Sequence, residues 1–192
     1  MKDKNLIKNL YNMTKLHLGC GWRDFGPDWV HIDGGDYPHL KYKDITLLPF
    51  EDNTVDLIYA SHVVEYFDRE EVLSILKEWN RVLKHGAVLR IAVPNFRVIS
   101  ELYLNENMPI EKFLGPMYGK MKMDNQTIYH RTIYDFNSLK DTLESCGFTN
   151  TSEYDWRKTE HSMFDDHSQA YIPHMDKENG TLISLNIETI KK

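Results

Sequence analysis

Cysteine is scarce in this chain of 192 residues, which contains only Cys20 and Cys146. Because these two lie far apart, neither a disulfide framework nor a paired set of metal ligands is expected. Long apolar runs are missing too: none approaches the roughly 20 residues that a membrane-spanning helix needs. Residues 1–15 lack the apolar centre of a secretory signal. We therefore expect a cytoplasmic protein with no membrane partner.

Basic clusters are also lacking. The formal net charge is −6, and no group of lysines and arginines is large enough to grip a phosphate backbone. A nucleic-acid partner is therefore not expected. The sequence shows no internal repeat or low-complexity block. Its length suits one domain with a substantial core, and we expect a single domain over residues 1–192.

Residues 15–33 predict a strand, a glycine turn and a second strand. Leu16 and Leu18 begin an apolar run that breaks at Gly19-Cys20-Gly21, and a second run over residues 29–32 ends on Asp33. In open parallel sheets, ligands bind beyond the carboxyl ends of the strands, where glycine lets the backbone approach them closely. A carboxylate at the tip of the second strand can accept hydrogen bonds from ribose hydroxyls. The stretch therefore predicts a nucleoside-cofactor site formed by Leu18, Gly19, Cys20, Gly21 and Asp33.

The residues after the turn indicate which cofactor is bound. The dinucleotide pattern G-x-G-x-x-G seats a pyrophosphate on a helix N-terminus. Here the third glycine position holds Asp24, and Asp28 follows. These carboxylates would repel a pyrophosphate, which disfavours NAD and FAD. S-adenosylmethionine (SAM) combines an adenosine with a cationic sulfur and suits acidic surroundings better. The plainer alternative is a turn between two strands that binds no ligand.

The run His17-Leu18-Gly19-Cys20-Gly21, followed by Asp33, resembles motif I and the second-strand acid of class I SAM-dependent methyltransferases. Within that family, the chain resembles small, single-domain members of the methyltransferase type 11 kind. The resemblance implies an α/β fold: a Rossmann-like, seven-stranded, mostly parallel sheet with an antiparallel last strand, helices on both faces and a short N-terminal cap. The chain departs from the family after Gly21, where Gly26 and Pro27 leave no room for the usual helix.

Two later segments extend the resemblance. In the family, an acid followed by Ile or Leu after the third strand contacts the adenine, and Asp44-Ile45 occupies that position. For Asp44, a turn acid is the alternative. The run Ser61-His62-Val63-Val64-Glu65-Tyr66 is similar to a His-x-x-Glu-His pattern with Tyr66 in place of the second histidine. This implies that Ser61 and His62 lie beside the cofactor's sulfonium. Glu65 then either faces the substrate or acts as a partner of the next helix dipole.

Periodicity and capping signals predict the elements of the second half. Residues 68–84 form an apolar stripe of helical period, and Asp68 is placed to cap this helix together with Glu71. Residues 87–93 predict a buried strand that Pro94 ends. Helices are expected over residues 96–105 and from Asp135 to Cys146, with strands over residues 148–156 and 181–188.

Two irregular segments interrupt this alternation, a lid insertion at about residues 95–133 and a tail loop at about residues 157–180. Long irregular insertions in a compact domain are usually functional, and in the family the first commonly covers the substrate. We expect substrate contacts from these segments and from the His62 motif: Glu65, Arg131, Asp165, Asp166 and Tyr171. His161 and Asp165 also have the spacing of a helical metal pair. A divalent-metal site and a merely solvated loop remain the alternatives, and the metal is the less favoured.

Methyl transfer from a sulfonium is an in-line displacement, to which an enzyme contributes mainly proximity and alignment. A hydroxyl acceptor also needs a general base, and histidine titrates near neutral pH. The candidate bases are His130 at the end of the lid, His167 in the tail loop and His62.

The acidic charge and the polar lid and tail favour a small, hydroxyl-rich acceptor. Small family members with this shortened linker are frequently associated with surface polysaccharide or glycan synthesis. The resemblance therefore implies a sugar O-methyltransferase that converts SAM to S-adenosylhomocysteine. Another small metabolite, an amine or an acid, is the alternative substrate. A non-catalytic SAM-binding interaction protein and an NAD-dependent enzyme are alternatives of other classes.

Overall fold

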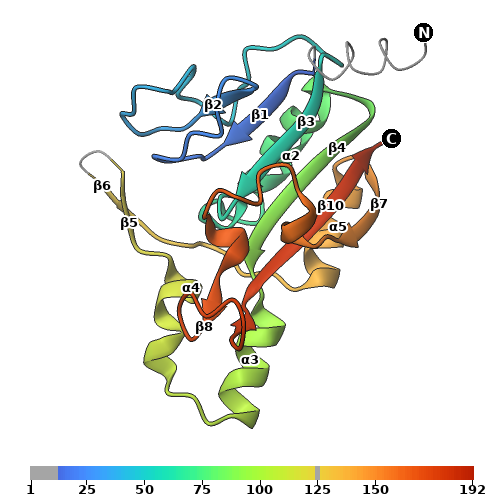
Figure 1. Cartoon of the computed structure of the whole chain (residues 1–192). Helices are drawn as coiled ribbons and strands as arrows, with labels where there is room; N and C mark the ends of the chain where they lie inside the picture. The colour runs from blue at the N-terminus through green and yellow to red at the C-terminus, as the bar shows by residue number, and fades with distance from the viewer. Residues whose placement is uncertain (1–12, 124–125) are drawn as a thin grey trace, which may run out of the picture.

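A computed structural model describes residues 13–123 and 126–192, so most of the expected N-terminal cap lies outside the described residues. A six-stranded sheet runs through the middle of the molecule (Figure 1). Its strands follow the order β2 (Trp29–Ile32), β1 (Lys15–Leu18), β3 (Val55–Ser61), β4 (Leu83–Pro94), β10 (Ser184–Lys191) and β7 (Phe148–Glu153). The first four are parallel, whereas β10 is antiparallel to both neighbours. This arrangement confirms the Rossmann-like α/β class with an antiparallel last strand.

The main sheet has six strands in the described residues rather than the expected seven, and the difference lies beside β2. Tyr42 makes only an isolated parallel bridge with Ile32, and its carbonyl accepts a hydrogen bond from Asp33 N at 3.3 Å. The chain then turns away, because Asp44 Oδ1 accepts hydrogen bonds from the backbone N–H (2.7 Å) and the hydroxyl (2.6 Å) of Thr46. An acidic side chain that fastens its own turn stops this edge strand after one residue.

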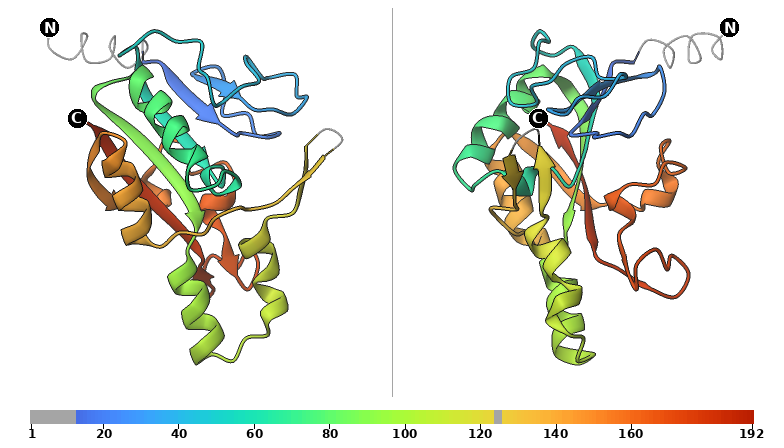
Figure 2. Two further views of the ribbon diagram at one scale, coloured as in Figure 1. Left: turned by 180° about the vertical axis from the view of Figure 1, so that it is seen from behind. Right: turned by 90° about the vertical axis from the view of Figure 1, so that its left-hand side faces the viewer.

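Two α-helices, α2 (Glu71–Val82) and α5 (Phe136–Ser145), pack side by side on one face of the sheet (Figure 2). Their apolar stripes join the inner side chains of β1, β3, β4 and β10 in the main core. Asp68 Oδ1 accepts from Glu71 N at 2.8 Å, and Asp68 N donates to Glu71 Oε2 at 3.3 Å, so the predicted reciprocal cap forms. Asp135 and Ser138 form the same motif at α5. Helix α2 ends earlier than predicted because the backbone is already extended at Leu83, where β4 begins.

The opposite face carries loops and the 3₁₀ helices η3 (Trp156–Lys158) and η4 (His167–Gln169) instead of α-helices. The ring of Phe25 stacks on His17 and Phe164, at 4.0 Å and 4.8 Å between centroids. His161 lies 4.1 Å from the ring of Tyr59. The expectation of helices on both faces is therefore met here only by short 3₁₀ turns. The physical reason is the short connection between β1 and β2, which leaves this face to be covered by rings from the tail loop.

Beyond β4 the chain forms an arm from α3 (Phe96–Asn105), η2 (Ile110–Lys112), α4 (Leu114–Tyr118) and the hairpin β5 (Met121–Met123) and β6 (Gln126–Ile128). The tail loop adds the short pair β8 (Tyr171–Ile172) and β9 (Thr181–Leu182), which lies beside the arm (Figure 1). A second apolar core joins the two segments: Ile99, Leu102, Phe113, Ile172 and Ile183. The predicted lid and tail loop are thus one packed layer at the carboxyl end of β4.

The predicted boundaries of the last strands also shift. The strand expected over residues 148–156 ends at Glu153, and the one expected over residues 181–188 divides into β9 and β10. Helix α3 matches its expected range, and Asn95 Oδ1 caps it by accepting from Val98 N at 3.4 Å. No helix of the described ranges is long and apolar enough to cross a bilayer.

The imidazoles of the loop-covered face predict that the fold loses stability in mild acid. Burial lowers the pKa of His161 to about 4, and it also lowers the pKa values of His17 and His31. In the unfolded chain these groups take up protons near pH 6.5, so their contribution to stability is present above that pH and is lost as the pH falls. From His161 alone we expect a loss of about 2 kcal/mol between pH 7 and pH 5. Urea unfolding at several pH values measures this slope.

The matched variant is His161→Phe, which fills the same stack without a titrating group. It should unfold with a visibly flatter pH dependence than the wild-type chain. Identical slopes for the two proteins would show that His161 is not held neutral by its surroundings.

Candidate active site

The glycine turn after β1 adopts a backbone that suits glycine. Gly19 and Gly21 have φ values of +64° and +56°. A Cβ on Gly19 would lie 2.3 Å from Val63 Cγ2, so the turn passes directly beneath the chain that follows β3. A Cβ on Gly21 would meet nothing within 4 Å. The space beside Gly21 therefore leaves the backbone open to a ligand.

Asp33 is held at the tip of β2 by two backbone amides. Gly21 N donates to its Oδ2 at 2.8 Å, and Gly35 N donates to its Oδ1 at 2.7 Å. Each oxygen keeps a second lone pair, which suits the ribose-binding role expected for this residue. Leu18 and Cys20 are buried at the same turn. Burial, together with nearby Asp33, raises the pKa of the Cys20 thiol to about 12, so this position offers backbone groups rather than a reactive sulfur.

Asp44 and Ile45 are engaged in structural contacts on the far side of β2. Hydrogen bonds from Thr46 lower the pKa of Asp44, which is therefore an ionised turn acid. The carbonyl of Ile45 accepts from Trp79 Nε1 at 2.8 Å, which ties the turn to α2. These contacts match the turn alternative for Asp44, and an adenine contact from this pair stays a prediction.

At the end of β3, a carboxyl group is buried between two imidazoles. Glu65, in η1 (Val64–Tyr66), has no solvent exposure. Its Oε1 lies 3.4 Å from His62 Nδ1 and 3.7 Å from His130 Nε2. Neither carboxyl oxygen has a hydrogen-bond partner among the described residues. Burial raises the pKa of Glu65 to about 8 and lowers the pKa values of both histidines. The three side chains form a compact group that can hold and share a proton.

Residues 65 and 66 also hold the lid against the sheet. The backbone N–H groups of Arg131 and Thr132 donate to the Glu65 carbonyl at 2.8 Å and 3.3 Å. The Tyr66 hydroxyl donates to Gly119 O at 2.6 Å. Gly119 has φ +51°, and a Cβ there would fall 1.8 Å from Nε2 of His130. The arm therefore approaches the sheet closely enough for His130 to reach Glu65 only because residue 119 has no side chain.

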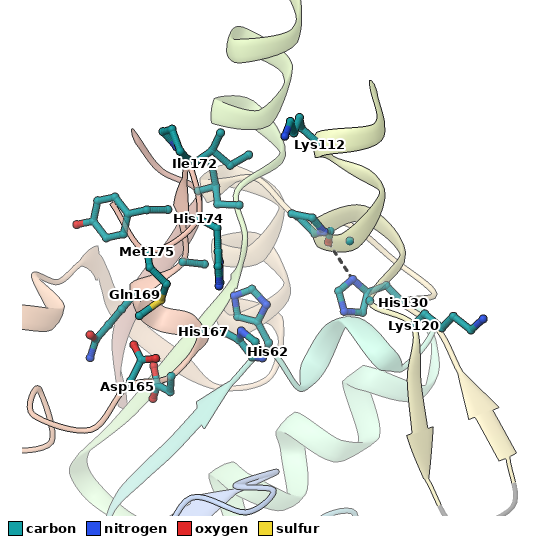
Figure 3. A pocket seen from close by; sticks show the side chains of 18 of the residues that line it. His62, Lys112, Lys120, His130, Asp165, His167, Gln169, Ile172, His174 and Met175 are labelled. Carbon is teal, nitrogen blue, oxygen red and sulfur yellow. Dashed lines mark hydrogen bonds between the residues drawn. The ribbon is translucent and has the colours of Figure 1, made fainter. Parts of the chain in front are cut away.

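All three candidate bases lie around one cavity of about 940 Å³ between the arm and the tail loop (Figure 3). The rings of His62 and His167 lie 5.1 Å apart, and His62 Nε2 is 3.3 Å from Ser184 Oγ on β10. Burial lowers the pKa of His167 as well. The volume suits a small-molecule ligand. Apolar side chains line much of the rest of the wall: Met108, Pro109, Pro116, Ile172, Pro173, Met175 and Ile183.

The predicted substrate residues divide into two groups. Asp165, Asp166 and Tyr171 line the cavity, and each is already engaged. Asp165 pairs with Lys177 at 3.0 Å, Asp166 accepts from the Tyr59 hydroxyl at 2.5 Å, and the Tyr171 hydroxyl accepts from Arg157 at 2.8 Å. Neither Arg131 nor Glu65 is part of the lining.

Arg131 turns outward to Glu71 of α2, 2.7 Å away, and Glu65 lies behind the two histidines. His161 belongs to the aromatic stack on the sheet, whereas Asp165 lines the cavity, so this pair does not form a metal site. In the residues that the structure describes, no group of three or more His, Cys, Asp or Glu side chains is arranged to hold a metal ion.

Sequence reasoning missed several cavity residues. Arg23, Lys112 and His174 contribute polar side chains to the wall, and Ser184 contacts His62. Arg23 had a local signal, since it is the cation that immediately follows the glycine turn. Ser184 had none, because only the tertiary pairing of β10 with β4 places it at this edge.

Comparison with known proteins agrees with this geometry. The sequence family described as "Methyltransferase domain" matches residues 29–91. The chain is 31% identical over 119 residues to a demethylmenaquinone methyltransferase from Staphylococcus haemolyticus, a match that covers 57% of this chain and 47% of the relative. The same enzyme of Staphylococcus aureus (strain JH9) is 31% identical over 120 residues, covering 58% and 47%. The chain thus spans about half the length of the curated relatives it matches.

Solved structures extend the likeness of the fold to almost the whole chain. A SAM-dependent methyltransferase from Methanosarcina mazei superposes with a TM-score of 0.56 at 17% identity, covering 97% of this chain and 96% of that one. One from Archaeoglobus fulgidus gives 0.55 at 16% identity, covering 99% and 91%. The fold is that of the class I SAM-dependent methyltransferases. The matched domain sequence over residues 29–91 is likewise that of a methyltransferase, and SAM is the cofactor named for these solved structures.

The residues of the turn fit that cofactor. Asp33 keeps acceptors for ribose hydroxyls, and the space beside Gly21 is open. Bound SAM would be held by the turn and by Asp33, and it supplies a methyl group already activated on sulfur.

The two glycines of the turn should respond differently to a methyl group. Gly21→Ala adds only the cost of a left-handed alanine, and we expect a loss of about 1 kcal/mol of unfolding free energy. Gly19→Ala adds the overlap with Val63 to the same backbone cost, and we expect a loss of about 2–4 kcal/mol. Urea unfolding of both variants measures the difference. Equal losses would show that Val63 moves aside freely and does not hold the turn.

Proposed function

We propose that this chain transfers the methyl group of SAM to a hydroxyl of a small hydrophilic acceptor, with a sugar hydroxyl as the leading candidate, as in glycan or polysaccharide synthesis. The observation that supports this most is the meeting of His62, His130 and His167 around one cavity beside the carboxyl ends of β3 and β4. In this fold class the reacting groups gather at that edge of the sheet.

His62 has the best geometry for the base. Its Nδ1 faces Glu65, its Nε2 lies 3.3 Å from Ser184 Oγ, and the residue itself lines the cavity. Because burial holds its pKa well below the ordinary value, the imidazole is neutral at pH 7 and free to accept the proton of an acceptor hydroxyl. Glu65 is protonated at pH 7, so it stabilises the imidazolium on His62 only as the carboxylate that remains once its own proton has moved away. Its own proton can pass toward His130, which lies 3.7 Å from the same oxygen.

The apolar part of the cavity supports a second candidate acceptor. Met108, Ile172 and Ile183 are apolar residues of the cavity lining, and the matched relatives are named as demethylmenaquinone methyltransferases. A quinol-like acceptor with a ring hydroxyl would suit such a wall. The same histidine could then remove a ring proton for methylation at carbon.

The direct test is release of S-adenosylhomocysteine from SAM in the presence of a panel of sugars, nucleotide sugars, amines and demethylated quinols. Turnover with sugars alone would support the leading acceptor, and turnover with quinols alone would replace it with the second candidate. Binding of SAM without turnover on any acceptor would favour a non-catalytic binding protein. A shift in melting temperature with NAD but not with SAM would contradict methyl transfer altogether.

The substitution Glu65→Gln should change stability and catalysis in opposite directions, raising the first at pH 8 and lowering the second. The folded pKa of Glu65 is raised to about 8, so its favourable contribution is complete below its ordinary pKa of 4.5 and is lost as the pH rises toward 8. An amide does not ionise. We therefore expect the variant to be more stable than the wild type at pH 8, by roughly 1–3 kcal/mol.

The same substitution should lower kcat about 10- to 100-fold, since glutamine cannot balance the charge on His62, while the acceptor KM changes little. Steady-state kinetics and urea unfolding at pH 6, 7 and 8 provide both readouts. A variant that is less stable at every pH and keeps its kcat would show that Glu65 serves only the packing of the lid.

A further inference from the structure

The chain after the glycine turn has no helix. Two short turns, at residues 21–22 and 27–28, and irregular chain between them connect Gly21 to Trp29, where β2 begins. In nucleotide-binding α/β folds, a helix that starts at this point offers its first N–H groups to the anionic part of the cofactor. This chain lacks that device, so the negatively charged end of a bound cofactor needs another partner.

Arg23 occupies the vacant position. Its Nε donates to the backbone carbonyl of Asp165 at 2.8 Å, and its guanidinium carbon lies 4.9 Å from the ring of Trp22. These contacts fix the side chain while leaving the two terminal nitrogens free. Within residues 13–123 and 126–192, no carboxylate lies within 4.0 Å of it. The guanidinium of Arg23 is thus held in position, and it has no carboxylate partner among the described residues.

The surroundings do not neutralise Arg23. It lines the cavity together with His62 and His167, both of which burial keeps neutral near pH 7. The two carboxylates of the cavity wall are engaged elsewhere, Asp165 by Lys177 and Asp166 by the Tyr59 hydroxyl. A ligand that places an anionic group between the glycine turn and His62 would therefore meet a guanidinium that no carboxylate contacts directly.

We propose that Arg23 binds the carboxylate at the methionine end of SAM and of its product. The inference rests on the proposed function, because it requires that the turn binds this cofactor. The adenosine end would be held by Asp33 on one side of the turn, and the sulfur would face the cavity at His62. The amino-acid end is then directed toward residue 23. Guanidinium and carboxylate groups match each other in a two-pronged hydrogen-bond geometry that an ammonium group does not reproduce.

Truncating the ligand tests this directly. Isothermal calorimetry on the full chain, without acceptor, compares S-adenosylhomocysteine with 5′-methylthioadenosine, which keeps the adenosine and the sulfur but lacks the amino-acid end. We expect Arg23→Gln to weaken S-adenosylhomocysteine binding at least tenfold and methylthioadenosine binding less than twofold. Arg23→Lys should recover part of the loss, since it keeps the charge without the fork.

The matched control is Arg69→Gln, which removes an exposed arginine at the approach to α2 and should bind both ligands like the wild type. Urea unfolding of each variant checks that the fold is intact. Equal weakening of both ligands by Arg23→Gln would assign Arg23 to the shape of the turn and overturn the proposal. Unchanged binding of both ligands, even with a raised acceptor KM, would overturn it as well, because the cation would then serve the acceptor. A wild-type chain that binds neither ligand would overturn the proposed function itself, and the variants would play no part in that result.

Discussion

The short connection between β1 and β2 is the constraint on which most of this molecule depends. With no room for a helix after the glycine turn, one face of the sheet has to be covered from elsewhere. The rings of Phe25, Phe164 and His161 take over that task, two of them supplied by the tail loop. The tail loop is in turn held down by a hydrogen bond between buried groups, from the Tyr59 hydroxyl to Asp166. The short connection between β1 and β2 thus determines how His161 and Phe164, more than a hundred positions later in the sequence, pack on the sheet.

The second organising contact is the carboxyl group of Glu65. Burying a carboxylate without hydrogen-bond partners costs free energy. Burial therefore disfavours the charged form of Glu65 and raises its pKa. The fold tolerates this cost at a point where two imidazoles, one from the sheet edge and one from the lid, come within 4 Å of the same oxygen. His62 itself has a left-handed backbone, with φ +54°. Strain and an unsatisfied buried acid at one position are typical of a site shaped by function rather than by stability.

The parts of this fold that could be predicted from the sequence are those with local causes. The strand, glycine turn and acid of residues 15–33, the caps at Asp68 and Asp135, and the helix over residues 96–105 depend on neighbours within a few positions. The prediction of a strand beside β2 was wrong for an equally local reason that sequence reasoning did not weigh: the side chain of Asp44, two residues after the bridge at Tyr42, stabilises a turn.

The candidate site was predicted in part. Three histidines from distant segments do meet, as expected for groups at one edge of a parallel sheet. Arg131 does not join them, because its nearest carboxylate belongs to α2, and no sequence pattern indicates that pairing. The cover formed jointly by the lid and the tail loop depends on a small core of Ile99, Phe113 and Ile183, whose members lie in different segments. Long-range packing of this kind has no periodic signal in the sequence.

Gly119 carries a consequence for how such chains can diverge. Because the imidazole of residue 130 occupies the volume where a side chain at residue 119 would project, the two positions are sterically linked although they lie on opposite sides of the hairpin. A related chain with a β-carbon at position 119 has no room for an imidazole at position 130. It therefore also loses the contact between His130 and Glu65 that can carry a proton between the lid and the sheet. Substitutions at positions 119 and 130 should therefore occur together. Glycine at 119 with histidine at 130 identifies related chains in which the lid contacts the sheet in the same way.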